Sequence, residues 1–197
     1  MFLPLNSFEN ICVCFLLLMI YSTIGWVAEM IYHSIVIGHM SEKRGFLNGF
    51  LCPIYGHGAL LVLYVLHGGL KNPILTFLAG MVLTSALEYF TSWIMEVLFH
   101  MRWWDYSNMK FNLGGYICPQ FSLLWGLGSV LMIKVVHPLL ARGSSPMPFN
   151  IMLIVDVVLL VLFVVDVAAS TAAAIGLNKY LREIDEQHGN DRKSQIA

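Results

Sequence analysis

Five long apolar runs are the feature of this sequence that most restricts its fold. They cover about residues 11–36, 54–70, 74–99, 120–141 and 149–176. A bilayer core about 30 Å thick needs roughly 20 apolar residues in an α-helix, and backbone groups inside lipid must be paired within the segment. Because 58% of the residues are hydrophobic and only 12% are charged, the composition excludes a soluble domain. We predict an all-α integral membrane protein with five transmembrane helices.

The distribution of lysine and arginine among the connections predicts the orientation of these helices. One side carries eight basic residues against two on the other: Lys43, Arg44, Arg102, Lys110, Lys179, Arg182, Arg192 and Lys193 against Lys71 and Arg142. Since the more positive side faces the cytoplasm, we expect the N-terminus outside and the C-terminus inside a bacterial plasma membrane. The transmembrane domain would cover residues 1–177. Residues 178–197 would form a charged cytoplasmic tail, as a frayed helix or a disordered segment.

Two stretches of the chain resemble each other, WVAEMIYH at 26–33 and WIMEVLFH at 93–100. In each unit a Cys-Pro pair follows, with Cys52 lying 26 residues after Trp26 and Cys118 lying 25 residues after Trp93. In both units, an aromatic residue and the pattern Gly-x-Gly follow the Cys-Pro pair. This order predicts the duplication of a two-helix unit, over about 11–70 and 74–141, with the fifth helix added. In the expected orientation both units run in the same direction, as a parallel repeat.

Each repeated stretch places tryptophan, glutamate and histidine at i, i+3 and i+7, which share one face of a helix. One interpretation is anchoring at the membrane interface, with Glu29, His33, Glu96 and His100 reaching water. In the other, the two glutamates face each other across the repeat axis. They would then bind a ligand or pair with the arginines of their own loops, Arg44 and Arg102.

Ionisable residues within membrane spans are rare and mark functional sites more often than surface charges do. Similar depth in the fourth and fifth spans predicts a structural ion pair between Lys134 and Asp156. The remaining carboxylates must be protonated, paired or bound to a cation. The candidate substrate path or binding site therefore comprises eight residues: Glu29, Glu88, Glu96, Arg44, Arg102, Asp105, His33 and His100.

The connection RWWDYS, residues 102–107, combines three aromatic residues with an arginine and an aspartate. It is typical of an aromatic belt at the headgroups, or of a re-entrant loop that lines a vestibule. The four cysteines fit neither a disulfide scaffold nor a zinc ribbon, and we interpret them as free thiols. On the fifth span, Asp166 and Ser170 lie on a strip of small residues suited to close helix contact.

No nucleotide-binding or hydrolase motif occurs in the sequence. The pattern G-x-x-x-x-G-K-[ST] is missing, so ATP coupling would require another subunit, and neither H-E-x-x-H nor G-x-S-x-G is present. We expect no enzymatic activity, no cofactor, no bound metal and no nucleic-acid partner. The expected partners are the lipid bilayer, a separate ATPase or other membrane subunit, and a second copy of the chain.

Four stretches together resemble the bacterial family of ABC-transporter type IV, CmpB-like permeases, which are small multi-pass membrane proteins. They are GWVAEMIYHSI (25–35), KRGFLNGFLCPIYGHGALL (43–61), ALEYFTSWIMEVLFHMRWWDYSNMKFNLGGYIC (86–118) and FSLLWGLGSVLMIKVVHP (121–138). The resemblance covers about residues 8–140. It implies a permease or membrane subunit of a transport system, without an ATPase of its own.

Two other functions remain open from the residues. One is a membrane-embedded enzyme that acts on a lipid or amphiphile at the inner interface, using Glu29, Glu96, Arg44 and Arg102. The other is a scaffold that transports nothing, whose polar side chains only hold helices together. In a scaffold the polar groups within the spans would all be paired, and no cavity would open between them.

Overall fold

The computed structural model describes residues 8–37, 45–66, 72–143 and 148–196, and within these ranges every regular element is a helix. In chain order they are α1 (Phe8–Ile37), α2 (Pro53–Leu66), α3 (Pro73–Phe99), α4 (Pro119–Leu131), a π-helical turn η1 (Met132–Val136), α5 (His137–Gly143) and α6 (Phe149–Ile196). Four apolar segments are long enough to cross a membrane: Phe8–Val36, Pro73–Phe99, Pro119–Arg142 and Phe149–Ile184. The predicted all-α membrane fold is confirmed.

Prolines define the start of several helices, and a residue in the left-handed backbone conformation defines the end of one. Helices α2, α3 and α4 begin with Pro53, Pro73 and Pro119, because proline has no N–H to lose in a first turn and its φ suits a helix. At the end of α3, His100 adopts a φ of 53° and donates its N–H to the Glu96 carbonyl at 2.7 Å. This left-handed cap turns the chain into the following connection.

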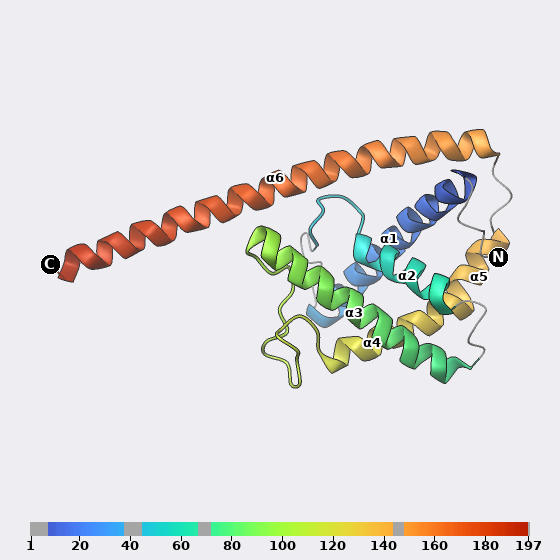
Figure 1. The fold of residues 1–197 in the computed structure, drawn as a ribbon, viewed down its shortest axis with the longest axis horizontal. Coiled ribbons are helices and arrows are strands. Elements are labelled where there is room, and N and C mark those ends of the chain that lie inside the picture. Colours follow the sequence, from blue (N-terminus) through green and yellow to red (C-terminus); the bar gives the residue numbers. More distant parts are fainter. Residues whose placement is uncertain (1–7, 38–44, 67–71, 144–147, 197) are drawn as a thin grey trace.

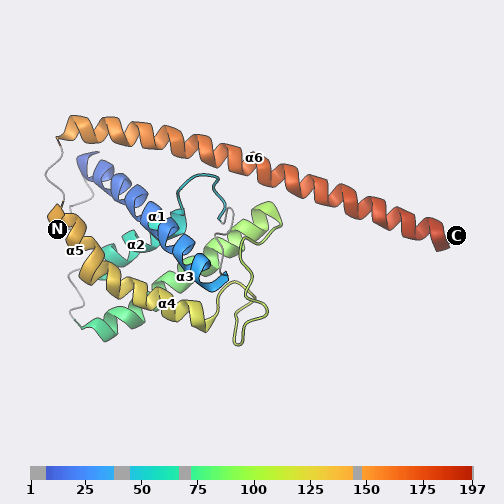
Figure 2. The same ribbon diagram turned by 180° about the vertical axis from the view of Figure 1, so that it is seen from behind.

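Helices α1, α3 and α6 run in one direction, and α2 and the continuous α4–α5 segment run in the other (Figures 1 and 2). Within this bundle α1 packs on α2, and α3 packs on α4. Residues 45–52 and 100–118 lie at the same end as the C-terminal half of α6, which extends past the bundle (Figure 1). The two long connections therefore share one end of the molecule with the C-terminal extension.

Helix α6 is longer than the predicted fifth span and continues through the charged segment after residue 177. Of the two forms expected for the tail, residues 178–196 adopt the helical one, and the disordered alternative is wrong there. This segment contains strong helix formers such as leucine, arginine and glutamate. Lys179 and Glu183 also pair at i and i+4, with 3.9 Å between Nζ and Oε1.

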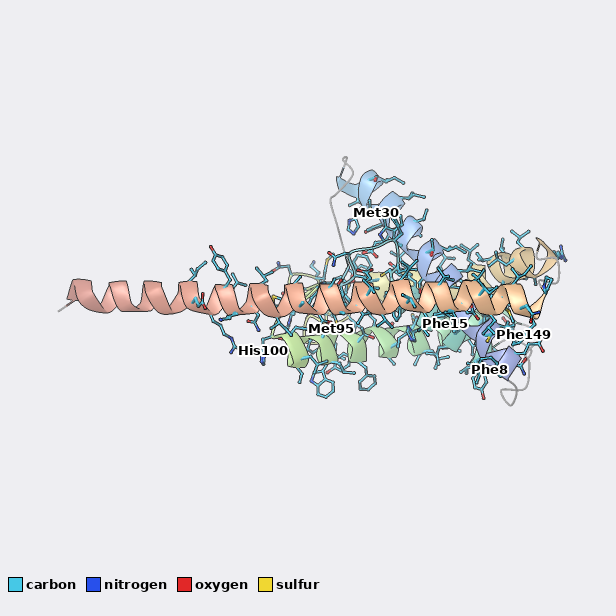
Figure 3. The ribbon with its side chains drawn as sticks, turned by 90° about the horizontal axis from the view of Figure 1, so that it is seen from above. Phe8, Phe15, Met30, Met95, His100 and Phe149 are labelled. Carbon is cyan, nitrogen blue, oxygen red and sulfur yellow. The ribbon has the colours of Figure 1, made fainter. Side chains whose placement is uncertain are left out.

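Helix α6 packs across α1. In Figure 3, α6 runs horizontally in front of α1. Phe8 and Phe149 meet at one end with their ring centroids 6.2 Å apart. Met30 and Met95 lie on opposite sides of α6 (Figure 3). Each methionine is next to a repeated glutamate, so the ends of α1 and α3 that carry Glu29 and Glu96 diverge from each other.

Each hairpin contains a close helix contact at matching positions of its sequence. Leu18 lies eleven residues before Glu29, as Ser85 does before Glu96, and Gly56 lies four after Cys52, as Ser122 does after Cys118. A Cβ on Gly56 would lie 2.6 Å from the Leu18 carbonyl oxygen. In the second hairpin the Ser85 hydroxyl donates to Ser122 at 2.8 Å. Small residues allow close helix approach at both crossings.

Helix α2 is shorter than the predicted second span, since its 14 residues extend only about 21 Å. It begins deep beside α1, where the Cys52 N–H donates to the Ser22 carbonyl at 3.2 Å. Ser22 lies 15 residues before the end of α1, or about 22 Å along its axis. The non-helical residues before α2 therefore reach the depth of the middle of α1.

Asp166 of α6 supplies the hydrogen bonds that this non-helical segment requires. Its Oδ1 accepts the Asn48 N–H at 3.0 Å and its Oδ2 accepts the Gly49 N–H at 2.9 Å. Ser170, one turn further along α6, accepts from the Asn48 side-chain amide at 2.7 Å. Backbone at membrane depth is tolerated only when such groups are satisfied by protein or water. The strip predicted for helix packing instead binds a loop.

We predict that Asp166→Asn destabilises the protein, because an amide removes the negative charge and one of the two acceptor oxygens that bind the Asn48 and Gly49 N–H groups. The Asn48 N–H keeps Ser170 Oγ as a second acceptor at 3.1 Å. Loss of a hydrogen bond to a charged acceptor still costs about 1–3 kcal/mol, so the variant purified in detergent should melt at a lower temperature.

Glu183→Gln is the matched control, a carboxylate-to-amide change on the same helix. The Glu183 side chain is 57% exposed and lies 3.9 Å from Lys179, and because exposed ion pairs contribute little, its replacement should leave the melting temperature close to that of the wild type. Equal melting of wild type and Asp166→Asn would contradict this assignment.

Candidate functional site

A cavity of about 740 Å³ lies between the two hairpins, and side chains of both line it. Helices α1, α2, α3 and α4 all contribute residues to its wall. Residues 103–106 of the connection after α3 close part of one end. The cavity therefore lies where a parallel repeat would place a shared central site.

Three carboxylates and a histidine line this cavity: Glu29, His33, Glu88 and Asp105. Glu29 Oε1 lies 4.0 Å from His33 Nε2, and Glu29 Oε2 accepts a weak hydrogen bond from the Cys52 thiol at 3.6 Å. Glu88 is only 4% exposed. Its Oε1 accepts from the Tyr106 hydroxyl at 3.1 Å. The polar part of the wall is thus acidic.

Aromatic rings make up much of the remaining wall. Tyr55 of α2 and Trp125 of α4 have centroids 5.0 Å apart, and Tyr106 stacks on Phe121 at 4.8 Å. Tyr32 of α1 meets Phe121 edge-on at 6.2 Å. These ring pairs join elements from both hairpins, so they hold the cavity walls in fixed positions as well as covering them.

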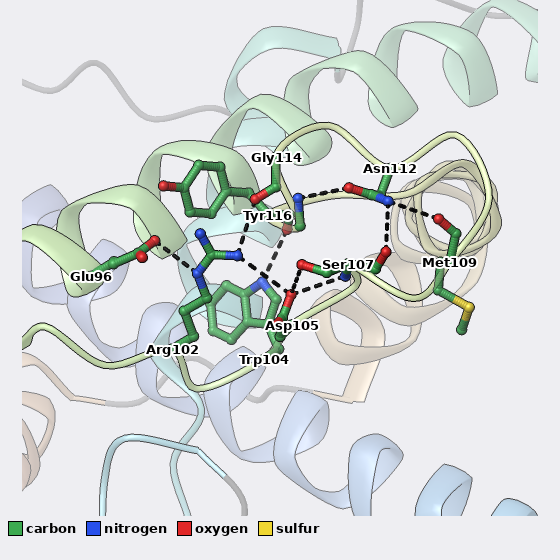
Figure 4. A network of polar contacts seen from close by, with 10 residues as sticks. Glu96, Arg102, Trp104, Asp105, Ser107, Met109, Asn112, Gly114 and Tyr116 are labelled. Carbon is green, nitrogen blue, oxygen red and sulfur yellow. Dashed lines mark hydrogen bonds and ion pairs between the residues drawn. The ribbon is translucent and has the colours of Figure 1, made fainter. Parts of the chain in front are cut away.

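A polar network fixes the connection that carries residues 103–106 (Figure 4). Arg102 donates from Nε to Glu96 at 2.9 Å and from Nη1 to the Gly114 carbonyl at 3.1 Å. Its guanidinium also lies 4.8 Å from the centre of the Tyr116 ring. The Trp104 indole donates to the Tyr116 carbonyl at 3.1 Å. The network therefore ties both ends of the connection to α3.

The turn inside this connection depends on Asp105 and glycine. Asp105 accepts from the N–H and hydroxyl of Ser107, at 2.9 and 2.5 Å. These bonds, with Arg102 nearby, lower the pKa of Asp105 and keep it ionised at neutral pH. Gly115 has a φ of +78°, and a Cβ there would lie 2.6 Å from Arg102 Nη1 and from Asp105 Oδ1. A side chain at position 115 would disrupt the network.

The predicted site residues divide into two groups. Glu29, His33, Glu88 and Asp105 line the cavity, whereas Glu96, His100 and Arg102 do not. Instead Glu96 pairs with Arg102, one of the arrangements that the sequence left open. His100 is exposed at the end of α3. Arg44 lies outside the described residues.

The pairing of Lys134 with Asp156 stays a prediction. Lys134 belongs to the π-helical turn of the fourth span, and Asp156 is 6% exposed on α6. Neither oxygen of Asp156 has a hydrogen-bond partner among the residues that the structure describes.

Sequence reasoning missed several residues of the cavity wall. Tyr55, Phe121 and Trp125 line it, although the candidate site residues named from the sequence were only carboxylates, arginines and histidines. Tyr55 and Trp125 are the aromatic residues that precede Gly-x-Gly in the two units. Their matching positions were a signal that could have placed them in the shared site.

The apolar helices define a multi-pass membrane protein with an acidic, aromatic cavity inside its bundle. The chain belongs to the family described as "Putative ABC-transporter type IV", which matches residues 16–171. This match includes most of the fifth span, which the resemblance seen in the sequence left out. No curated protein and no solved structure matches the chain. Family membership thus indicates a component of a transporter.

We predict that Arg102→Gln loosens the connection after α3, because Glu96 and the Gly114 carbonyl lose a charged, multidentate donor. Backbone amides of residues 103–117 should exchange hydrogen faster in the variant. Arg102→Lys is the matched control for charge, and it should restore little protection because an ammonium cannot reproduce the planar fork. Wild-type exchange rates in Arg102→Gln would show that the network does not hold the connection.

Proposed function

We propose that this chain is the membrane-embedded permease subunit of a transport system that works with a separate ATPase. The observation that carries this proposal is the 740 Å³ cavity between the hairpins, with carboxylates on its wall. Family membership supports the transport role. A scaffold would have no reason to keep Glu88 buried with Oε2 unpaired, since such a group lowers stability.

The proposal includes an orientation with the N-terminus outside and the C-terminus in the cytoplasm. Support comes from the shared end of residues 45–52, residues 100–118 and the extension of α6 (Figure 1). Basic residues in this part of the chain include Arg102, Lys110, Lys179 and Arg182, and positive charge favours the cytoplasmic side. A cytoplasmic ATPase would then dock at the end where both connections lie.

The orientation predicts that a fluorescent protein fused after Ala197 folds in the cytoplasm and fluoresces. Alkaline phosphatase fused at the same position should be inactive, because it needs an extracytoplasmic location. A fusion after Arg142, in the connection between the fourth and fifth spans, is the matched control and should give the reverse pattern. If the C-terminal phosphatase fusion is active, the proposed orientation is wrong.

The transport role predicts a partner with its own nucleotide-binding P-loop. The tagged full chain, extracted from its native membranes in polymer-bounded lipid discs, should carry this ATPase and hydrolyse ATP. Deletion of residues 178–197 should reduce the recovered ATPase several-fold while the chain still inserts, since it removes the extension of α6. A preparation without a P-loop protein and without ATP hydrolysis would refute coupling to an ATPase. Full recovery after the deletion would refute docking on the extension.

A further inference from the structure

We infer that the cavity binds an organic cation, namely an amine, quaternary ammonium or similar centre with apolar substituents. This inference names the substrate class of the permease proposed above and rests on that proposal for transport. Binding itself requires only the cavity. The argument uses the charge of the wall, one unpaired carboxylate oxygen, and the aromatic faces around it.

The charge of the wall favours a positive ligand. Glu29, Glu88 and Asp105 line the cavity, and none of its described lining residues is a lysine or an arginine. Charges inside a bundle are screened far less than charges in water. Asp105 is partly compensated by Arg102, whose Nη1 lies 3.4 Å from its Oδ1. Glu29 and Glu88, in contrast, have no lysine or arginine partner among the described residues of the wall. An anion that entered would face these two carboxylates, and a cation would be attracted before any close contact formed.

Glu88 supplies the position where a cation would bind. It is 96% buried, and one of its oxygens already accepts the Tyr106 hydroxyl at 3.1 Å. Trp125 also contacts this carboxylate, and Oε2 has no hydrogen-bond partner among the residues that the structure describes. A buried carboxylate oxygen without a partner is costly. A bound ammonium would remove this cost, which makes the site complementary to a cation.

The rings around Glu88 suit an alkylated cation better than a hydrated metal ion. Tyr55, Tyr106 and Trp125 present aromatic surface to the cavity, and such faces attract ammonium groups that carry methyl or larger substituents. Among the described residues, no group of three or more ligating side chains could hold a metal ion. The site therefore offers two negative groups and ring faces, but no metal coordination sphere.

The remaining wall accommodates the apolar part of such a ligand. Ile24, Leu124, Met132 and Val136 also line the cavity. Gly128 also lines it, and a Cβ at this position would have no neighbouring atom within 4 Å. The volume falls in the range of about 300–1,000 Å³ that is usual for sites of drug-sized ligands.

The test uses two probes of nearly the same shape and opposite charge. Radiolabelled tetraphenylphosphonium and tetraphenylborate are titrated into the full chain in phosphatidylcholine nanodiscs, and binding to empty nanodiscs is subtracted. We expect saturable binding of the phosphonium alone. Glu88→Gln and Glu29→Gln should each raise its Kd by about tenfold or more, as expected for loss of a desolvated charge partner.

Two further variants separate occupation of the cavity from general damage. Gly128→Phe should abolish phosphonium binding by filling the space, while its melting temperature stays close to wild type. Glu9→Gln removes an exposed carboxylate outside the cavity, and Gly176→Phe adds the same ring on α6, where a Cβ also has open space. Both controls should bind the phosphonium as wild type does.

The inference is overturned if the borate binds as well as the phosphonium. It is also overturned if no saturable phosphonium binding occurs, or if both glutamine variants in the cavity bind like wild type. Wild-type binding by both glutamine variants would show that the two carboxylates do not bind the phosphonium. Phosphonium binding by a chain that recruits no ATPase would refute the proposed transport coupling alone, whereas ATPase recruitment without phosphonium binding would refute the cation site alone.

Discussion

Hydrogen bonding of non-helical backbone at membrane depth is the constraint on which the rest of the structure depends. The segment before α2 reaches the level of Ser22, and its N–H groups at Asn48 and Gly49 cannot pair within a helix. Asp166 meets this need from a different helix. Because α6 must stay beside α1 to make these bonds, one carboxylate fixes both the loop and the fifth span.

The carboxylates within the apolar helices therefore have different roles, although the sequence presents them alike. Asp166 binds backbone N–H groups, and Glu96 binds Arg102. Both are neutralised by permanent partners and belong to the framework. Glu29 and Glu88 have only weak or incomplete partners and face the cavity. Asp156 on α6 also lacks a hydrogen-bond partner among the described residues but does not line the cavity, so Glu29 and Glu88 are the carboxylates of the spans that meet there.

Local patterns predicted the helices well, because apolar length and a starting proline act within one segment. Pro53 and Pro73 each precede an apolar run and begin α2 and α3. The contact from Asp166 to Asn48 joins residues 118 positions apart through backbone atoms, so no residue pattern announces it. The pairing of Glu96 with Arg102 was easier to predict, because Arg102 lies only six residues further along the chain. In the sequence, Tyr106 stands out only as one of the aromatic residues of the connection. Its hydrogen bond to Glu88 depends on the fold of residues 100–118 against α3, which no local pattern predicts.

The two hairpins differ at positions that line the cavity. Tyr21 lies eight residues before Glu29, as Glu88 does before Glu96. Tyr21, Glu29 and Glu88 all line the cavity, while Glu96 pairs with Arg102 outside it. Two carboxylates at equivalent positions of both hairpins would bring four negative charges to one site, and like charges repel strongly in a low dielectric. A tyrosine instead stands at the position that Glu88 holds in the second hairpin, and an arginine pairs with the counterpart of Glu29. Each hairpin therefore contributes one of the two glutamates from a non-equivalent position.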